Sequence, residues 1–279
     1  MAGFTTPAGL AVAALAVVIA GCSSAPNGKP AGKGTEAVSA ESKAASHALQ
    51  LAAYESQRVK SVTAKIIVHS KGSGAAAGNL TGTVDMQLKP KTMIKATFKI
   101  VSAKARPIEL DEILTGKAIY FQDPSFTKAA GKPWVVASLS ELSSKVGVSL
   151  GSLLQNLESS NPLDQARLFV ASKNAHLVGP AVIHGVHTTE YAGTYSPAAA
   201  LAQLTPKLRK LMGPALGEIG TNPVQFEVWV DAQHRIRRAR DTDNVRGQIV
   251  TTTLNVTSVN KPVHITLPSP GEVAPLPKI

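Results

Sequence analysis

The chain has 279 residues, with 29 Lys and Arg against 18 Asp and Glu, so its formal net charge is +11 and its isoelectric point is near 9.8. Hydrophobic residues make up 44% of the chain, which suffices for a packed core and excludes a chain that is disordered throughout. The single cysteine, Cys22, excludes an internal disulfide and a cysteine-rich metal site.

The N-terminal segment has the pattern of an export signal. Residues 10–20 are apolar and uncharged, and Gly21 and Cys22 follow them. This run is shorter than the roughly 20 residues that span a bilayer, but it matches the hydrophobic region of a secretory signal peptide. The first 21 residues hold no Lys or Arg, although signal peptides carry positive charge there. Either the true start lies upstream, or the terminal amine alone supplies that charge.

Residues 18–22, VIAGC, resemble the bacterial lipoprotein box. The resemblance implies that residues 1–21 are removed as a signal peptide and that the sulfur of Cys22 receives a diacylglyceryl group. It also implies acylation of the new amino terminus, with palmitate as the expected chain. The alternatives are an ordinary secretory signal with an incidental cysteine, or a short anchor that is never cut.

The next segment has the composition of a tether. Residues 22–43 are rich in Ser, Ala, Pro, Gly and Lys, and they contain no aromatic residue. Such a stretch buries too little apolar area to fold, and about 20 flexible residues reach on the order of 25 Å. No change in composition divides the rest, so we expect residues 44–279 to form a single domain.

The first half of that domain predicts a helix followed by strands. Residues 44–57 are Ala-rich with helical spacing. Apolar and polar residues then alternate, which predicts an antiparallel meander with one apolar face over residues 61–70, 80–89, 94–100, 108–114 and 118–122.

The second half predicts helices and then strands again. Leucines recur at helical spacing within residues 134–171, where Asn161 and Pro162 mark a helix start, and a further helical patch covers residues 197–212. Strands are predicted for residues 175–183 and 187–194, joined by a turn at His184-Gly185, and for residues 224–230, 234–240 and 247–259. The tail, residues 263–277, holds too many prolines for a central strand. Segregated strands and helices favour an α+β fold, with helices laid on one face of a curved antiparallel sheet.

This order of elements resembles the LppX/LprA/LprF/LprG group of actinobacterial lipid-binding lipoproteins. The likeness covers nearly the whole chain through short motifs: the lipobox at Cys22, the strand of residues 117–120 followed by Trp134, and the strands of residues 185–191 and 226–231. The resemblance implies a half-barrel sheet covered by helices on its concave face. It also implies an apolar cavity between the two layers that takes up acylated lipids or glycolipids, and it carries over no catalytic residues.

Periodicity alone selects the candidate cavity residues, which are Ile66, Val84, Met86, Phe98, Leu153, Leu154, Leu157, Phe226 and Val228. Aromatic residues are only 4% of the chain, so few large rings are present to fill an aliphatic interior. The alternative is that these side chains pack solid, as protein interiors do.

The densest positive run gives the candidate membrane contacts. On a strand, Arg235 and Arg237 fall on one face and Arg238 and Arg240 on the other. One interpretation is an edge strand protected from aggregation by charge, and the other is a patch that meets anionic lipid head groups. Nucleic acid is a poor partner, because the export signal removes the protein from it and no aromatic residues interleave the arginines.

Two motifs suggest chemistry, and both have simpler explanations. Residues 147–151 match the G-x-S-x-G pattern of hydrolases around Ser149, but the segment before them reads as helix, whereas the motif needs a strand there. His184, His187 and Glu190 have metal-like spacing, but on a strand the two histidines point to opposite faces.

We therefore expect a protein that is not an enzyme and has no cofactor and no metal. It is expected to bind an acylated lipid or glycolipid and carry it within the cell envelope, anchored on the extracytoplasmic face of a bacterial cell membrane. An envelope transporter is a further expected partner. The alternative function is a solid-core interaction or sensor protein that docks a protein partner.

Overall fold

The computed structural model describes residues 40–71, 78–102, 107–138, 166–204, 209, 221–245 and 248–277. The described chain begins with helix α2 (Ala40–Ser56). Its buried side chains recur every three or four residues, so one face of the helix packs inward, as the sequence predicts. These residues are Ala45, Leu49, Ala52 and Ala53.

The first half of the described chain forms a meander in which each strand pairs antiparallel with the next. The alternating segments of the sequence become strands at nearly the predicted bounds. The elements are β1 (Ser61–Lys71), β2 (Gly78–Gln87), β3 (Met93–Ser102), β4 (Ile108–Thr115), β5 (Ala118–Gln122), α3 (Pro124–Ala130) and β6 (Trp134–Ser138).

The second half adds a further meander with two short helices. Helix α7 starts where Ser196 caps it, because the Oγ of Ser196 accepts a hydrogen bond from the N–H of Ala199 and Pro197 suits the first turn. The elements are α6 (Ala166–Val170), β7 (His176–Ile183), β8 (Val186–Tyr195), α7 (Pro197–Gln203), β9 (Val224–Asp231), β10 (Ile236–Val245), β11 (Gln248–Val259), η2 (Pro270–Glu272) and β12 (Val273–Pro275).

All of these strands join one 12-stranded sheet, in the order β12-β6-β5-β4-β3-β2-β1-β11-β10-β9-β8-β7. The two meanders meet in the middle, where β1 pairs antiparallel with β11 and Ile66 lies opposite Leu254. The proline-rich tail contributes only the short strand β12, which pairs parallel with β6 at one edge. This placement agrees with the prediction that the tail cannot form a central strand.

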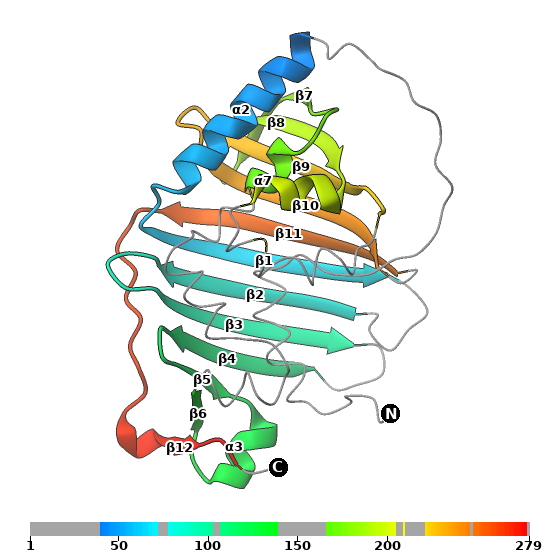
Figure 1. Ribbon diagram of the computed structural model, residues 1–279. Coiled ribbons are helices and arrows are strands. Elements are labelled where there is room, and N and C mark those ends of the chain that lie inside the picture. The colour runs from blue at the N-terminus through cyan, green and yellow to red at the C-terminus, as the bar shows by residue number, and fades with distance from the viewer. Residues whose placement is uncertain are drawn as a thin grey trace.

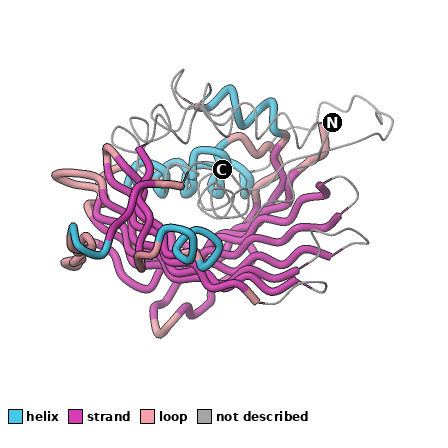
Figure 2. Tube along the Cα trace, turned by 90° about the horizontal axis from the view of Figure 1, so that it is seen from below, coloured by secondary structure: helices cyan, strands magenta, loops and turns pink. Residues whose placement is uncertain are grey.

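The sheet curls into an open trough. Figure 2 shows the strands curving around the helices, and Figure 1 shows α2 crossing the end of the sheet that holds β7 to β10. Buried side chains of α2, α6 and α7 pack with those of β9 on the inner side of the curl. The architecture is an α+β open half-barrel, which confirms the predicted fold class.

The buried side chains form two groups. The first core cluster comes from β1 to β6 and β11, and the second core cluster comes from α2, α6, α7 and β8 to β10. In β1 every second residue enters the first core cluster, namely Val62, Ala64, Ile66 and Val68. One face of the sheet is therefore buried over the strands that supply the two clusters, as expected for a half-buried antiparallel sheet.

Two glycines leave space for the phenylalanine rings of the neighbouring strands. A Cβ placed on Gly82 of β2 would lie 2.4 Å from Cδ1 of Phe98, its partner on β3. A Cβ on Gly193 of β8 would lie 3.0 Å from the ring of Phe226, its partner on β9. Each ring thus occupies the space that a side chain on the neighbouring strand would fill.

The turn between β7 and β8 is at His184-Gly185, as predicted. Both residues have positive φ, 49° and 78°, which is the backbone of a two-residue hairpin turn. The glycine adopts this conformation without a steric cost.

The structure corrects two predictions about the strands. Trp134 to Ser138, placed in a helical stretch, form strand β6, because Val135 and Ala137 alternate into the first core cluster and the segment pairs with β5. The arginine strand is not an edge strand, because β10 lies between β9 and β11. Its charge therefore does not protect an open sheet edge.

Candidate functional site

The candidate cavity residues of the first meander lie together on the inner face of the sheet. Ile66, Val84, Met86 and Phe98 come from β1, β2 and β3, and each is at most 2% exposed. Cross-strand register places Val84 between Ala64 and Ala96. These four residues belong to the first core cluster, so the structure brings them together.

The remaining candidates lie elsewhere. Phe226 and Val228 belong to the second core cluster on β9, beneath the helices. The Phe226 ring stacks on Phe169 of α6, with 4.8 Å between the centroids. Leu153, Leu154 and Leu157 lie outside the described residues.

The two clusters are joined by apolar residues on the central strands. Cross-strand pairing places Ile66 opposite Leu254, Leu254 opposite Ala239, and Ala239 opposite Val228. Leu254 and Ala239 are partly buried and pack against the first and second clusters, respectively. The inner face is therefore apolar along this row from β1 to β9.

One carboxyl group interrupts the apolar inner face of β4. Glu112 is 1% exposed, and its neighbours in the ladder are Ala96 and Phe121. Neither carboxylate oxygen has a hydrogen-bond partner within the described ranges. Burial, and secondly the charge of Asp123, raise the pKa of Glu112 to about 8, so this carboxyl is protonated at neutral pH.

The sequence carries a signal for the inward position of Glu112. Leu110 and Leu114 of β4 are both inward-facing, and the period of two therefore places Glu112 on the same side. An acidic residue at an inward position is the uncommon case, because buried carboxyls are costly unless they are paired.

A second acidic group lies where the two clusters meet. Asp241 and Asp243 of β10 face the same side as Phe226, and Oδ1 of Asp241 is buried with no hydrogen-bond partner in the described part of the chain. Burial, and then the charge of Asp243, raise the pKa of Asp241 well above its ordinary value. Burial and the same two carboxyls raise the pKa of Tyr195, whose ring also contacts Phe169 and Phe226.

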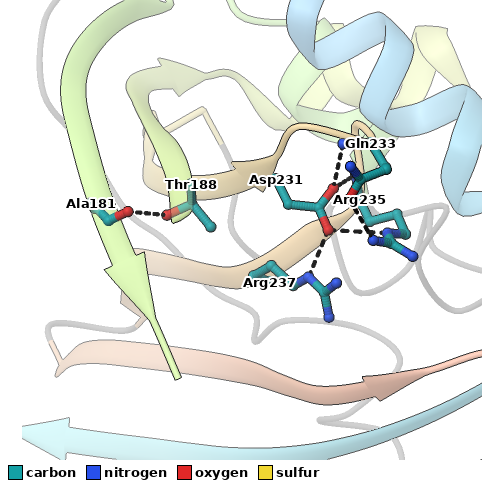
Figure 3. A network of polar contacts seen from close by, with 6 residues as sticks. All are labelled: Ala181, Thr188, Asp231, Gln233, Arg235 and Arg237. Carbon is teal, nitrogen blue, oxygen red and sulfur yellow. Dashed lines mark hydrogen bonds and ion pairs between the residues drawn. The ribbon is translucent and has the colours of Figure 1, made fainter. Parts of the chain in front are cut away.

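Arg235 and Arg237 share one buried partner, Asp231, at the turn between β9 and β10. Figure 3 shows its carboxylate between the two guanidinium groups. Oδ2 accepts hydrogen bonds from Nε of Arg235 at 3.0 Å and from Nε of Arg237 at 2.8 Å, and Oδ1 accepts from the backbone N–H groups of Gln233 and Arg235. Burial opposes the charge of Asp231, but these bonds and the two guanidinium charges outweigh it and lower its pKa.

The sequence predicts Arg235 and Arg237 on one face and Arg238 and Arg240 on the other, but the bulge in β10 between Ile236 and Arg238 breaks this alternation. Trp229 lies two residues before Asp231 on β9 and shares its face, so the predicted division of the arginines is wrong.

Arg238 and Arg240 share Trp229. Their guanidinium carbons lie 5.3 and 5.6 Å from the centroid of the Trp229 ring, a cation–π arrangement. Arg238 donates to Asn255 at 2.6 Å, and Arg240 forms an ion pair with Glu227. All four candidate arginines therefore have partners within the protein, and their contact with a membrane stays a prediction.

Neither the G-x-S-x-G motif nor the group of His184, His187 and Glu190 gains support as a reactive or metal-binding site from the described residues. Ser149 lies outside the described residues. His184 lies in the hairpin turn, His187 is exposed, and Glu190 accepts a hydrogen bond from Nε1 of Trp229 at 3.0 Å. In the described ranges, no three His, Cys, Asp or Glu side chains gather as a metal site. Among the described helices, none is long and apolar enough to cross a membrane.

Solved structures share this architecture. LprF from Mycobacterium bovis matches with a TM-score of 0.51 and 15% identity, covering 82% of this chain and 97% of LprF. The lipoprotein LppX from Mycobacterium tuberculosis matches with a TM-score of 0.45 and 17% identity, covering 80% of this chain and 99% of LppX. No family model matches the sequence, and the search of curated proteins finds no match.

The likeness to LprF shows that this chain has the LppX/LprF-like fold, an open curled sheet with helices on its inner side. The resemblance inferred from the sequence is thereby confirmed at the level of the fold.

Proposed function

We propose that this protein is a non-enzymatic lipoprotein on the extracytoplasmic face of a bacterial cell membrane, which binds an acylated lipid or glycolipid and carries it within the envelope. The observation that carries the proposal is the apolar inner face, which extends over β1 to β6 and continues through Leu254 and Ala239 to β9. The acyl chains lie against this face. The likeness to LprF supports the proposal through the fold.

The physical basis is the hydrophobic effect. Each methylene that an acyl chain buries contributes roughly 0.8 kcal/mol, so a long chain gains on the order of 10 kcal/mol before the cost of its ordering. A trough of aliphatic side chains suits such a ligand, because it offers area without requiring directional contacts. Helices α2, α6 and α7 cover the β7 to β9 end of the sheet, and among the described helices only α3 packs a side chain, Ala130, against the first core cluster.

The first test is chemical identification of the ligand. The full chain with Cys22→Ala carries no acyl anchor, so any lipid extracted from it by organic solvent is bound and not covalently attached. Mass spectrometry of the extract is expected to show an acylated lipid at near-equal molar amount. Protein that contains no co-purifying lipid would count against the proposal.

A matched pair of tryptophan variants separates a lipid site from a solid core. Ala64 is 1% exposed on the inner face, and Thr83 is an exposed residue on the outer face of the adjacent strand. If the inner face holds lipid, the Ala64→Trp indole takes the place of part of the ligand, so bound lipid falls while the protein stays folded. If the core is solid, the same change overpacks it and costs about 1–3 kcal/mol of stability. Thr83→Trp is expected to change neither quantity.

Docking of a protein partner is the second candidate function, favoured by the apolar surface of the edge strand β7. Leu177, Val178 and Val182 are each more than half exposed there. Crosslinking in intact cells distinguishes the two functions: one stoichiometric protein partner with no bound lipid favours docking.

A further inference from the structure

The starting point is the contrast among the three acidic residues of β4. Glu109 and Asp111 point to the outer side, where Glu109 pairs with Lys99 at 3.4 Å and Asp111 accepts a hydrogen bond from Thr97 at 2.5 Å. Glu112 points to the inner side, is 1% exposed, and has no partner for either oxygen among the described residues. An unpartnered buried carboxyl is costly, so it calls for an explanation.

The surroundings of Glu112 are those of an apolar binding face. Its neighbours along the strand on the same side are Leu110 and Leu114, and its neighbours across the ladder are Ala96 and Phe121. All four belong to the first core cluster. Ala96 is small, so the strand next to Glu112 places little side-chain bulk beside the carboxyl.

The protonation state decides what Glu112 can bind. Burial, together with the nearby Asp123 carboxylate, keeps the group neutral at pH 7. A neutral carboxyl has one O–H donor and a carbonyl acceptor, so it complements a neutral oxygen group. A metal ion is a poor occupant, because the described residues place no group of three ligating side chains there.

We propose that Glu112 is the hydrogen-bonding point of the lipid site, which binds an ester or hydroxyl oxygen carried within the lipid's chains and so selects oxygenated chains over plain hydrocarbon. This inference rests on the proposed lipid-binding function and adds a specificity-determining residue to it. The partner is an oxygen that enters the trough with the chains, because Glu112 lies within the apolar cluster.

The experiment measures selectivity with three neutral probes of matched carbon number. A wax ester offers an ester oxygen, a secondary alcohol offers a hydroxyl, and a hydrocarbon offers neither. Each radiolabelled probe is supplied at trace level in phosphatidylcholine vesicles to the immobilised full-length protein, and the retained label is counted per protein. The variants are Glu112→Gln, which keeps a donor and an acceptor, and Glu112→Leu, which keeps neither. Glu109→Leu, on the outer face of the same strand, is the control.

The readout is the ratio of oxygenated probe to hydrocarbon within each variant, which does not depend on the fraction of active protein. The wild type, Glu112→Gln and Glu109→Leu are expected to prefer an oxygenated probe, and Glu112→Leu is expected to lose about two- to tenfold of that preference, the effect of one net hydrogen bond. Preference for the wax ester or for the alcohol identifies which oxygen is bound.

Two results overturn the inference and are distinguishable. If all probes bind but Glu112→Leu keeps the wild-type ratio, or the wild type shows no preference, Glu112 does not select the ligand, while the lipid-binding function stands. If the wild type retains no probe at all, both the inference and the proposed function fail.

Discussion

Two buried carboxyls of this sheet, Asp231 and Glu112, differ in almost every respect except their burial. The side chain of Asp231 is 1% exposed, accepts four hydrogen bonds and lies between two guanidinium groups, so it keeps its charge. Glu112 is equally buried but has no such partners in the described part of the chain, and its pKa is raised to about 8. The Asp231 carboxylate fixes the β9–β10 turn, whereas Glu112 is the group that we propose binds an oxygen of the ligand.

The raised pKa of Glu112 predicts a specific pH dependence of stability. Because the folded pKa is about 8 and the ordinary value is 4.5, the folded state holds a proton that the unfolded state releases between these values. Stability therefore falls as pH rises through that range, by up to about 1.4 kcal/mol per pH unit, and levels off above pH 8. Glu112→Gln removes this loss, so its gain over the wild type in urea unfolding is expected to be larger at pH 8 than at pH 4.

The matched control for that measurement is Glu109→Gln, which changes an acid on the outer face of the same strand. Its stability difference from the wild type is expected to vary little with pH, because a surface ion pair contributes only about 0–1 kcal/mol. Parallel stability curves for the wild type and Glu112→Gln would show that Glu112 ionises normally in the folded protein.

At the scale of elements, the pairing of β2 with β3 depends on a residue without a side chain. Phe98 lies over Gly82, and a Cβ at Gly82 would also lie 2.7 Å from the backbone oxygen of Thr97. Backbone atoms do not move aside cheaply, so we expect Gly82→Ala to cost about 1–3 kcal/mol in chemical unfolding. Gly271→Ala is the control, since nothing lies within 4 Å of its Cβ position, and it is expected to be nearly neutral. A Gly82→Ala protein as stable as the control would contradict this packing.

The strands themselves were largely predictable, because alternation of apolar and polar residues reports burial on one face. The bounds of β5, Ala118–Gln122, match the prediction, and β1 to β4 match within a few residues. The predictions that were wrong, for β6 and β10, have physical reasons. Trp134 to Ser138 precede a leucine-rich segment whose helical spacing masked their own alternation, and β10 continues to Val245 through the polar residues Arg240 to Asn244. The charge of β10 suggested an edge strand, but β10 lies between β9 and β11, and its residues Arg237 and Arg240 form ion pairs within the protein.

At the scale of the whole molecule, the proposed anchor at Cys22 determines where the protein lies. One acyl chain alone binds a membrane marginally, but two or more chains hold a protein stably. We therefore expect the wild type to remain in the membrane fraction after a high-salt wash and Cys22→Ala to be released, as measured by immunoblotting. Ser23→Ala is the control and is expected to stay anchored. Cys22→Ala protein that resists the wash would show a different means of attachment.

The sequence by itself determined the local features of this protein. The alternation of apolar and polar residues predicted the strands, and helical spacing predicted α2. The His184-Gly185 pair predicted the hairpin turn, and the VIAGC segment predicted a lipoprotein. These follow from residues close together in the chain. It also selected the inward residues of β1 to β3, because the period of two is a local property.

Only the tertiary structure decided how these parts combine. It joined β1 to β11, two strands that are far apart in the chain, and so closed two meanders into one sheet. It divided the described candidate cavity residues between two clusters, gave the four arginines partners within the protein, and left Glu112 buried without a partner in the described chain. Each of these outcomes depends on which residues, far apart in the chain, lie close together on the same face of the sheet. The pattern of residues along the chain does not contain that information.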